Sequence, residues 1–191
     1  MKKLLLTLAF SFLCLFAYAA SPVTYYFDAY DSGGEEWDFA PEKMVDGLAT
    51  DASHAYDNTG SNNTQLLTGN TCAGTNLGTI TKVEIRGYQS TLFDDPVWDY
   101  IHYRPVFSGS SDGDEHYEQV NTGNGDWGSY FDITSDTNHP ETWSWSDVQN
   151  LDCDVRSESN DASPAVGCSL VEIRVTYTTG AAARRRIIMV E

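Results

Sequence analysis

The amino-acid sequence predicts an all-β fold, an antiparallel β-sandwich of the jelly-roll kind. Short segments in which apolar and polar residues alternate with period two recur along the chain, separated by clusters of Gly, Asn, Asp and Ser. No window of a dozen residues carries a helical period. About eight such segments fall in the roughly 160 residues of one domain, which is typical of a sandwich.

The first candidate strands are rich in aromatic residues. They are VTYYFDAY at 23–30 and WDYIHYRPVF at 98–107. Pro105 favours an edge position for the second, because proline cannot donate to a ladder. The segment TKVEIRG at 81–87 alternates around Val83 and Ile85.

Three further strands follow in the second half of the chain. SYFDI at 129–133 places Phe131 and Ile133 on one face, and DCDVR at 152–156 alternates again. SLVEIRVTYT at 169–178 has the clearest pattern, with Val171, Ile173, Val175 and Tyr177 predicted to point inward. The polar connections at 57–76 and 108–116 are predicted to be surface loops.

Both ends of the chain differ from the domain at 20–179. Residues 1–19 have the charged, apolar and small-residue order of a signal peptide, which predicts a secreted, extracellular or periplasmic protein with no stable membrane insertion. The tail GAAARRRIIMVE at 180–191 is either a disordered end or a strand that adds to a neighbouring copy.

The charge of the chain is strongly negative. The net charge of −17 becomes −19 without Lys2 and Lys3, which leaves 9 basic against 28 acidic residues. Such a surface repels nucleic acid and is compatible with divalent cations, although a solvated acidic face needs no partner.

Three cysteines remain after the signal peptide, and an oxidising compartment favours pairing. Cys153 and Cys168 flank a polar loop that a disulfide would close. Their alternation places them on different faces, so the pair requires Cys168 to lie before the regular strand, which Gly167 permits. Pairing of Cys72 with either partner stays open.

Three segments carry a family resemblance: EKMVDGLATDAS at 42–53, LGTITKVEIRG at 77–87 and CSLVEIRVTYT at 168–178. Together they resemble the galactose-binding-like jelly-roll family of discoidin-type and carbohydrate-binding modules. TCAGTNLG before the middle strand keeps the leucine and glycine of the family's pattern there and lacks its tryptophan. A looser similarity connects the segment at 140–151 to uncharacterised secreted or phage-related β-sandwich proteins.

The resemblance implies a structural calcium ion. Its ligands would be Asp46, the backbone around Leu48, Thr50 or Asp51, and Glu172. Calcium prefers carboxylate and carbonyl oxygens of this type. The alternative is an ordinary turn at Asp46 and Gly47 with a solvated Glu172.

The sequence predicts a binding or structural protein and not an enzyme. The four histidines, His54, His102, His116 and His139, form no metal-ligand pair, and no nucleophile elbow occurs. One hypothesis is a module that binds carbohydrate or a cell-surface partner through loop aromatics, namely Trp37, Tyr56, Trp98 and Trp127. The other is an extracellular assembly protein of a surface layer, appendage or phage-derived particle, which contacts copies of itself through its tail.

The tryptophans in TWSWSDVQ at 142–149 allow a sugar platform or a packing role. Ser146 and Gln149 fit a capping box, which predicts a single helical turn. Trp143 and Trp145 share a face if the approach is extended. The combination favours packing at one end of the sandwich.

Overall fold

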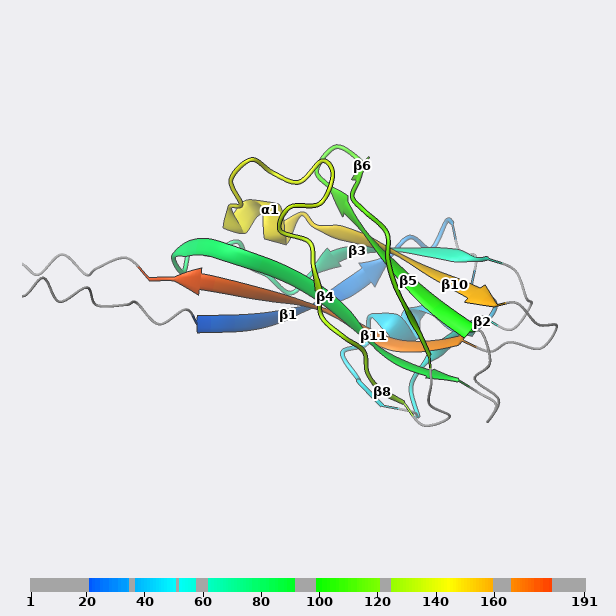
Figure 1. Ribbon diagram of the computed structural model, residues 1–191. Helices are drawn as coiled ribbons and strands as arrows, with labels where there is room; N and C mark the ends of the chain where they lie inside the picture. Colours follow the sequence, from blue (N-terminus) through cyan, green and yellow to red (C-terminus); the bar gives the residue numbers. More distant parts are fainter. Residues whose placement is uncertain are drawn as a thin grey trace, which may run out of the picture.

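The computed structural model describes residues 21–34, 37–50, 52–57, 62–91, 99–120, 125–159 and 166–179. The predicted signal peptide at 1–19 and the tail at 180–191 lie outside these ranges, as do Asp51 and Trp98. Strands are the dominant regular element in Figure 1, as the sequence predicts.

Two short helical elements and eleven strands make up the described structure. Their bounds are β1 Ser21–Tyr30, η1 Pro41–Met44, β2 Ala55–Asp57, β3 Thr64–Asn70, β4 Thr79–Thr91, β5 Asp99–Phe107, β6 Ser111–Asp112, β7 His116–Gln119, β8 Asp126–Trp127, β9 Phe131–Asp132, α1 Trp145–Gln149, β10 Asp152–Ser159 and β11 Val166–Thr178. No helix of the described residues is long and apolar enough to span a membrane.

The strands pair in two groups that share β1. In the first group β1 pairs with β11 and β11 with β4; β2 adds to β11, while β8 and β9 add to β4. In the second group β1 pairs with β3, β3 with β10 and β10 with β5, and β6 and β7 add to β5. Every pairing is antiparallel, and the arrangement is compatible with a β-sandwich.

The strand β1 serves both groups because it changes partner halfway. Residues 21–26 pair with β11, and the half that begins at Phe27 pairs with β3 (Figure 1). Phe27 lies at this change and is fully buried. The backbone of β1 therefore joins the two strand groups at one edge.

The hydrophobic core lies between the two groups. The predicted inward residues Val83, Ile85, Val171, Ile173 and Val175 are all fully buried, which confirms the alternation of β4 and β11. The second group contributes the alternating residues of β5 and β10 to the same cluster: Ile101, Tyr103, Cys153 and Val155.

Gly87 makes room for the largest fully buried side chain, Tyr103. A Cβ atom at Gly87 would lie 2.0 Å from the Tyr103 Oη and 2.7 Å from its Cζ. The hydroxyl donates to Gln89 Oε1 at 3.3 Å, so the ring has a fixed position. Glycine is required here by the close approach of the two strand groups.

The predicted loop at 57–76 is wrong in its centre, where β3 occupies Thr64–Asn70. Polar residues mask the alternation there. Gln65 and Leu67 point inward and are fully buried, and the Gln65 amide donates to the Asp31 carbonyl at 3.1 Å. A buried glutamine with a hydrogen-bond partner fills a core position that hydrophobicity alone does not reveal.

Pro105 lies inside β5 and not at the outer edge of its group. Its carbonyl accepts from Gly113 at 2.8 Å, on the side of β5 that carries the short strands β6 and β7. Those strands pair with β5 on either side of Pro105, at residues 106–107 and 100–103. The N–H that proline lacks would therefore face the gap between β6 and β7, so few backbone hydrogen bonds of the sheet are lost.

The tryptophans at 143 and 145 are packed in the core, with exposed fractions of 9 % and 4 %. The Trp143 indole donates to the Thr134 carbonyl at 3.0 Å, and Trp145 donates to the Gly78 carbonyl at 2.8 Å. The helical turn is present as α1, but its capping box joins Ser144 and Asp147, two residues earlier than the sequence predicts.

Residues 125–139 connect the two strand groups, because β8 and β9 pair with β4 while neighbouring residues contact β7. The backbone N–H of Ser129 lies 3.1 and 3.0 Å from the two carboxylate oxygens of Glu118 on β7. His116 Nε2 lies 2.8 Å from Asp136 Oδ2, and the His116 ring stacks on Phe131. These contacts join an edge strand of the second group to the segment that covers β4.

The expected disulfide is absent: Cys72, Cys153 and Cys168 are buried free thiols. Cys153 points inward from β10, and Cys168 points inward from β11. A register shift between Cys168 and Leu170 resolves the conflict of faces, so Cys168 lies within the strand and not before it. Burial raises the pKa of Cys168 to about 12.

Candidate functional site

The outer face of the second strand group carries a row of polar side chains. Cross-strand register places Tyr117, His102, Arg156 and Thr64 side by side on β7, β5, β10 and β3. The residues next to them along β5 and β10 point into the core, so alternation holds the polar row outward. Arg104 and Asp154 form a neighbouring pair on the same face.

Ion pairs fix this row in place. Arg104 Nη2 lies 2.5 Å from Asp154 Oδ2, and Arg156 Nε lies 3.0 Å from Glu115 Oε1. A second nitrogen of Arg156, Nη1, lies 3.2 Å from Glu158 Oε2. Guanidinium groups held by carboxylates on both sides are pre-oriented for further hydrogen bonds.

His102 lies at the centre of the row and is 5 % exposed. Arg156 Nη2 lies 2.9 Å from its Nδ1. Burial, and then the charge of Arg156, lower the pKa of His102 below its ordinary value of 6.5, although Glu115 and Glu158 oppose the shift. The same Nδ1 lies 3.3 Å from Glu115 Oε2, so a guanidinium and a carboxylate both meet this nitrogen.

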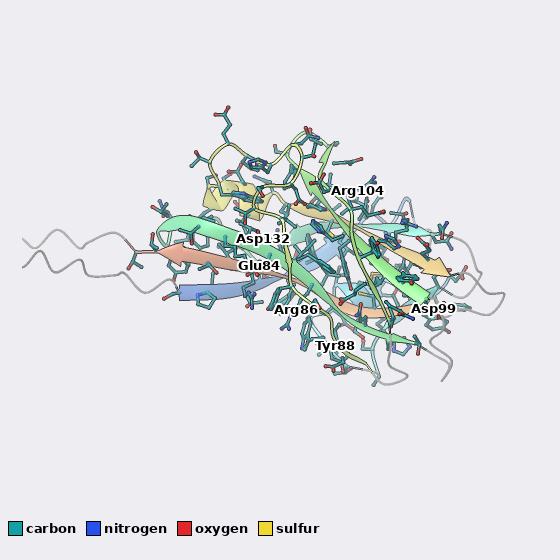
Figure 2. All side chains as sticks on the ribbon, in the orientation of Figure 1. Glu84, Arg86, Tyr88, Asp99, Arg104 and Asp132 are labelled. Carbon is teal, nitrogen blue, oxygen red and sulfur yellow. The ribbon has the colours of Figure 1, made fainter. Side chains whose placement is uncertain are left out.

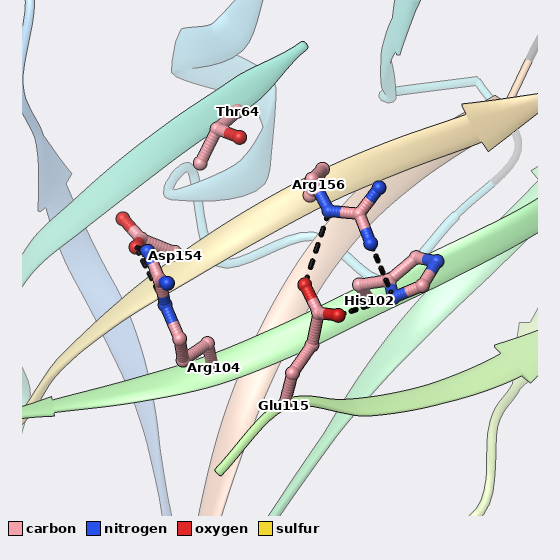
Figure 3. Close-up of a pocket in the computed structure, with 6 residues that line it drawn as sticks. All are labelled: Thr64, His102, Arg104, Glu115, Asp154 and Arg156. Carbon is pink, nitrogen blue, oxygen red and sulfur yellow. Dashed lines mark hydrogen bonds and ion pairs between the residues drawn. The ribbon is translucent and has the colours of Figure 1, made fainter. Parts of the chain in front are cut away.

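These side chains surround a surface depression in two adjoining parts, which we call the β5–β10 hollow. Figure 3 shows the residues that line the first part. One part, of about 260 Å³, is lined by Thr64, His102, Arg104, Glu115, Asp154 and Arg156. The other part, of about 430 Å³, shares His102, Glu115 and Arg156 and adds Tyr100, Tyr117 and Glu158.

Tyr117 gives the hollow an aromatic wall. Its side chain is 60 % exposed, the largest value among the exposed large hydrophobic residues of the described chain. Its ring stacks on His102 with centroids 5.2 Å apart, and Tyr100 meets it edge-on at 6.0 Å. The ring is thus held in place by its neighbours while much of it faces solvent.

The loop aromatics predicted to bind a ligand are dispersed. Trp37 is 3 % exposed and its indole donates to the Val155 carbonyl, so this residue lies in the core and not at the surface. Tyr56 stacks on the exposed Phe39 at 4.6 Å. Trp127 lies on β8 against Tyr88 and lines a separate, smaller depression of about 160 Å³.

The residues predicted to bind calcium have protein partners. Asp46 accepts from the Leu48 N–H at 2.9 Å and from the Ser53 hydroxyl, at a turn where Gly47 has φ +78°. The Thr50 carbonyl accepts from Ser169 at 2.9 Å.

Glu172 lies on the outer face of β11, as its alternation predicts, but it is paired. Arg86 Nε lies 2.6 Å from its carboxylate, and Tyr130 donates to the same oxygen. The part of the chain that is described contains no cluster of three His, Cys, Asp or Glu residues able to hold a metal ion. These residues do not fit a calcium ion by themselves, and Asp51 is not described, so calcium binding stays a prediction.

A stack of cations and rings covers the outer face of β4 and β11. The Arg86 guanidinium lies 4.2 Å from the Trp127 ring centroid and 4.1 Å from that of Tyr130, and Arg174 lies 3.4 Å from Tyr130. Figure 2 shows Glu84, Arg86 and Tyr88 along β4, with Asp132 nearby. Each cation here has a carboxylate partner, which indicates a structural role for Trp127.

The alternation of residues in two strands indicates the polar face of the hollow, although no known sequence motif marks it. YIHYR in β5 and DVRSE in β10 alternate apolar residues with charged or imidazole side chains. Period two alone puts His102 and Arg104 on one face, and Asp154 and Arg156 on one face. That the two strands are neighbours follows from the fold and not from the sequence.

The fold and the hollow define an all-β, antiparallel-sheet protein with a polar and aromatic site on one outer face. Comparison with protein-family models, with curated proteins and with solved structures found no match. The similarity to galactose-binding-like domains therefore rests on the sequence motifs.

Proposed function

We propose that this protein is a secreted, non-catalytic carbohydrate-binding module, a jelly roll of the galactose-binding-like type, whose ligand site is the β5–β10 hollow. Export is supported by the signal-peptide pattern at 1–19. The sandwich type is supported by the two antiparallel groups that share one core. The site differs from the loop site that the sequence suggests, because its aromatic group lies on a strand.

The observation that carries the proposal is the exposed ring of Tyr117 beside an ordered polar row. One face of a sugar ring is apolar and packs on an aromatic ring, while its hydroxyls require donors and acceptors. The hollow supplies donors from Arg104 and Arg156 and acceptors from Glu115 and Asp154. A ligand rich in hydroxyl groups matches both properties.

Replacing Tyr117 with alanine tests the proposal. We expect the dissociation constant for a glycan identified on an array to rise at least about tenfold, since the loss of one stacking surface costs about 1.4 kcal/mol or more. Isothermal titration of the secreted protein measures the effect. A thermal unfolding scan checks that the exposed side chain contributes little to folding.

Tyr56→Ala is the matched control, because Tyr56 is a partly exposed aromatic residue that stacks on Phe39 outside the hollow. Glycan binding should survive this change. Loss of binding in Tyr56→Ala with retention in Tyr117→Ala would place the site at Tyr56 and Phe39 instead of the hollow. No binding to any glycan at millimolar concentration would refute the proposed function.

A further inference from the structure

The two parts of the β5–β10 hollow differ in charge. The part of about 260 Å³ has two cations and two carboxylates among its lining residues: Arg104, Arg156, Glu115 and Asp154. The part of about 430 Å³, which we call the tyrosine part, has one cation and two carboxylates: Arg156, Glu115 and Glu158. The tyrosine part therefore carries one more carboxylate than its own guanidinium balances.

His102 does not supply the missing positive charge. Its Nδ1 lies 3.3 Å from a carboxylate oxygen of Glu115, and its Nε2 lies 2.9 Å from one of Glu158. Burial, and then the charge of Arg156, nevertheless lower the pKa of His102 below its ordinary 6.5. The ring is therefore mainly uncharged near neutral pH, whichever of its nitrogens carries the proton.

The excess negative charge lies beside the aromatic wall of the hollow. Tyr117 stacks on the same His102 ring that both carboxylates flank, with centroids 5.2 Å apart. The side chains of Glu115 and Glu158 are 42 % and 34 % exposed, whereas that of Arg156 is only 22 % exposed. A sugar ring that packs on Tyr117 therefore brings its substituents close to two accessible carboxylates.

We infer that the tyrosine part selects an amino sugar, whose ring packs on Tyr117 and whose ammonium group is held by Glu115 and Glu158. An ammonium group has three N–H donors, and its charge balances the excess carboxylate. The face of a tyrosine ring also attracts a nearby cation. This inference rests on the proposed function and adds the class of sugar that the hollow selects.

The same charges disfavour other classes of sugar. A uronate or sialate carboxylate would meet the excess negative charge, on a chain whose net charge is −17. An N-acetylated amino sugar retains a ring and hydroxyl groups for the hollow but carries no charge. Comparing the free and the acetylated amino sugar therefore isolates the contribution of the ammonium group.

The experiment is calorimetric titration of the secreted protein with glucosamine and N-acetylglucosamine oligomers of equal length, and with a uronate oligomer. It is done just below neutral pH, where the amino groups are charged. We expect the glucosamine oligomer to bind about tenfold more tightly than its acetylated counterpart, as for one charge pair at a partly exposed site. This preference should decrease as salt is added.

Glu158→Gln tests the inference at the site, because it removes the excess charge and keeps the shape of the side chain. We expect the preference for the glucosamine oligomer to fall to within about threefold, while binding of the acetylated oligomer changes little. Asp132→Asn is the matched control, since Asp132 is a half-exposed carboxylate outside the hollow, and it should keep the full preference.

The wild-type comparison gives a result even if a variant fails to fold. Equal binding of the two amino-sugar oligomers, tighter binding of the uronate oligomer, or a preference insensitive to salt would overturn the inference and leave the proposed function intact. A preference that survives in Glu158→Gln, or that is lost equally in Asp132→Asn, would also overturn it. Absence of binding to every saccharide would refute both the inference and the function on which it rests.

Discussion

Replacing Gly87 with alanine is expected to lower the free energy of unfolding by about 3 kcal/mol, the upper part of the range for overpacking a core. The new methyl group would lie 2.0 Å from the Tyr103 Oη, and Tyr103 is fully buried. The ring cannot move outward because its hydroxyl is held by Gln89 and its faces are packed between the strand groups. Urea unfolding of the two proteins measures the difference.

Gly33→Ala is the matched control, since its Cβ would meet Asp31 Oδ1 at an ordinary 3.4 Å. We expect it to change stability by less than about 0.5 kcal/mol. The Gly87→Ala penalty should shrink in a Tyr103→Phe background, where the nearest atom becomes Cζ at 2.7 Å. A Gly87→Ala protein as stable as the wild type would show that the strand groups are not packed as described.

Replacing Glu84 with glutamine is expected to cost about 2 kcal/mol at neutral pH, because it breaks a nearly buried ion-pair network. Glu84 is 3 % exposed and accepts from Arg174 at 2.7 and 2.8 Å and from Lys82 at 2.7 Å. Since both cations retain access to water, the cost is smaller than for a fully buried pair. Chemical unfolding at several pH values measures it.

The pH dependence of this loss has a definite sign. Hydrogen bonds from Arg174, and then from Lys82, lower the pKa of Glu84 below its ordinary 4.5, although burial opposes the shift. The carboxylate therefore stabilises the fold above pH 4.5, and this contribution disappears as the pH falls through the lowered pKa. The difference between wild type and Glu84→Gln should be constant near neutral pH and shrink below 4.5.

Asp132→Asn is the control for Glu84, because this carboxylate lies 3.6 Å from Lys82 and is half exposed. Its removal should cost less than about 1 kcal/mol. Equal effects of the two substitutions, or a Glu84→Gln difference that grows in acid, would contradict the network described for β4 and β11.

The strands with clear alternation could be predicted from the sequence. Val171, Ile173 and Val175 on β11 and Val83 and Ile85 on β4 point inward because period two and burial on one face agree there. Strand β3 could not be found this way, since Gln65 occupies a core position through its hydrogen bonds. Alternation along β11 places the Cys168 thiol on the outer face, and the register shift between Cys168 and Leu170 turns it to the inner face instead.

The candidate site was the less predictable part because it is built across strands distant in the sequence. Thr64, His102, Tyr117 and Arg156 meet only after β3, β10, β5 and β7 have paired. Sequence reading favoured aromatic residues near loops, and it could not see that Trp37 is buried. The presence of an aromatic residue in the sequence does not show whether its ring packs in the core or faces a ligand. Its exposure in the folded protein, beside ordered polar groups, makes that distinction.

The central claim, that the β5–β10 hollow is the ligand site, is tested most directly by mapping amide and side-chain NMR shifts as a glycan is added. The claim predicts that the largest changes fall on His102, Tyr117 and Arg156, with little change at Tyr56 and Trp127. Changes centred on Tyr56 or Trp127, with the hollow unperturbed at saturation, would contradict it.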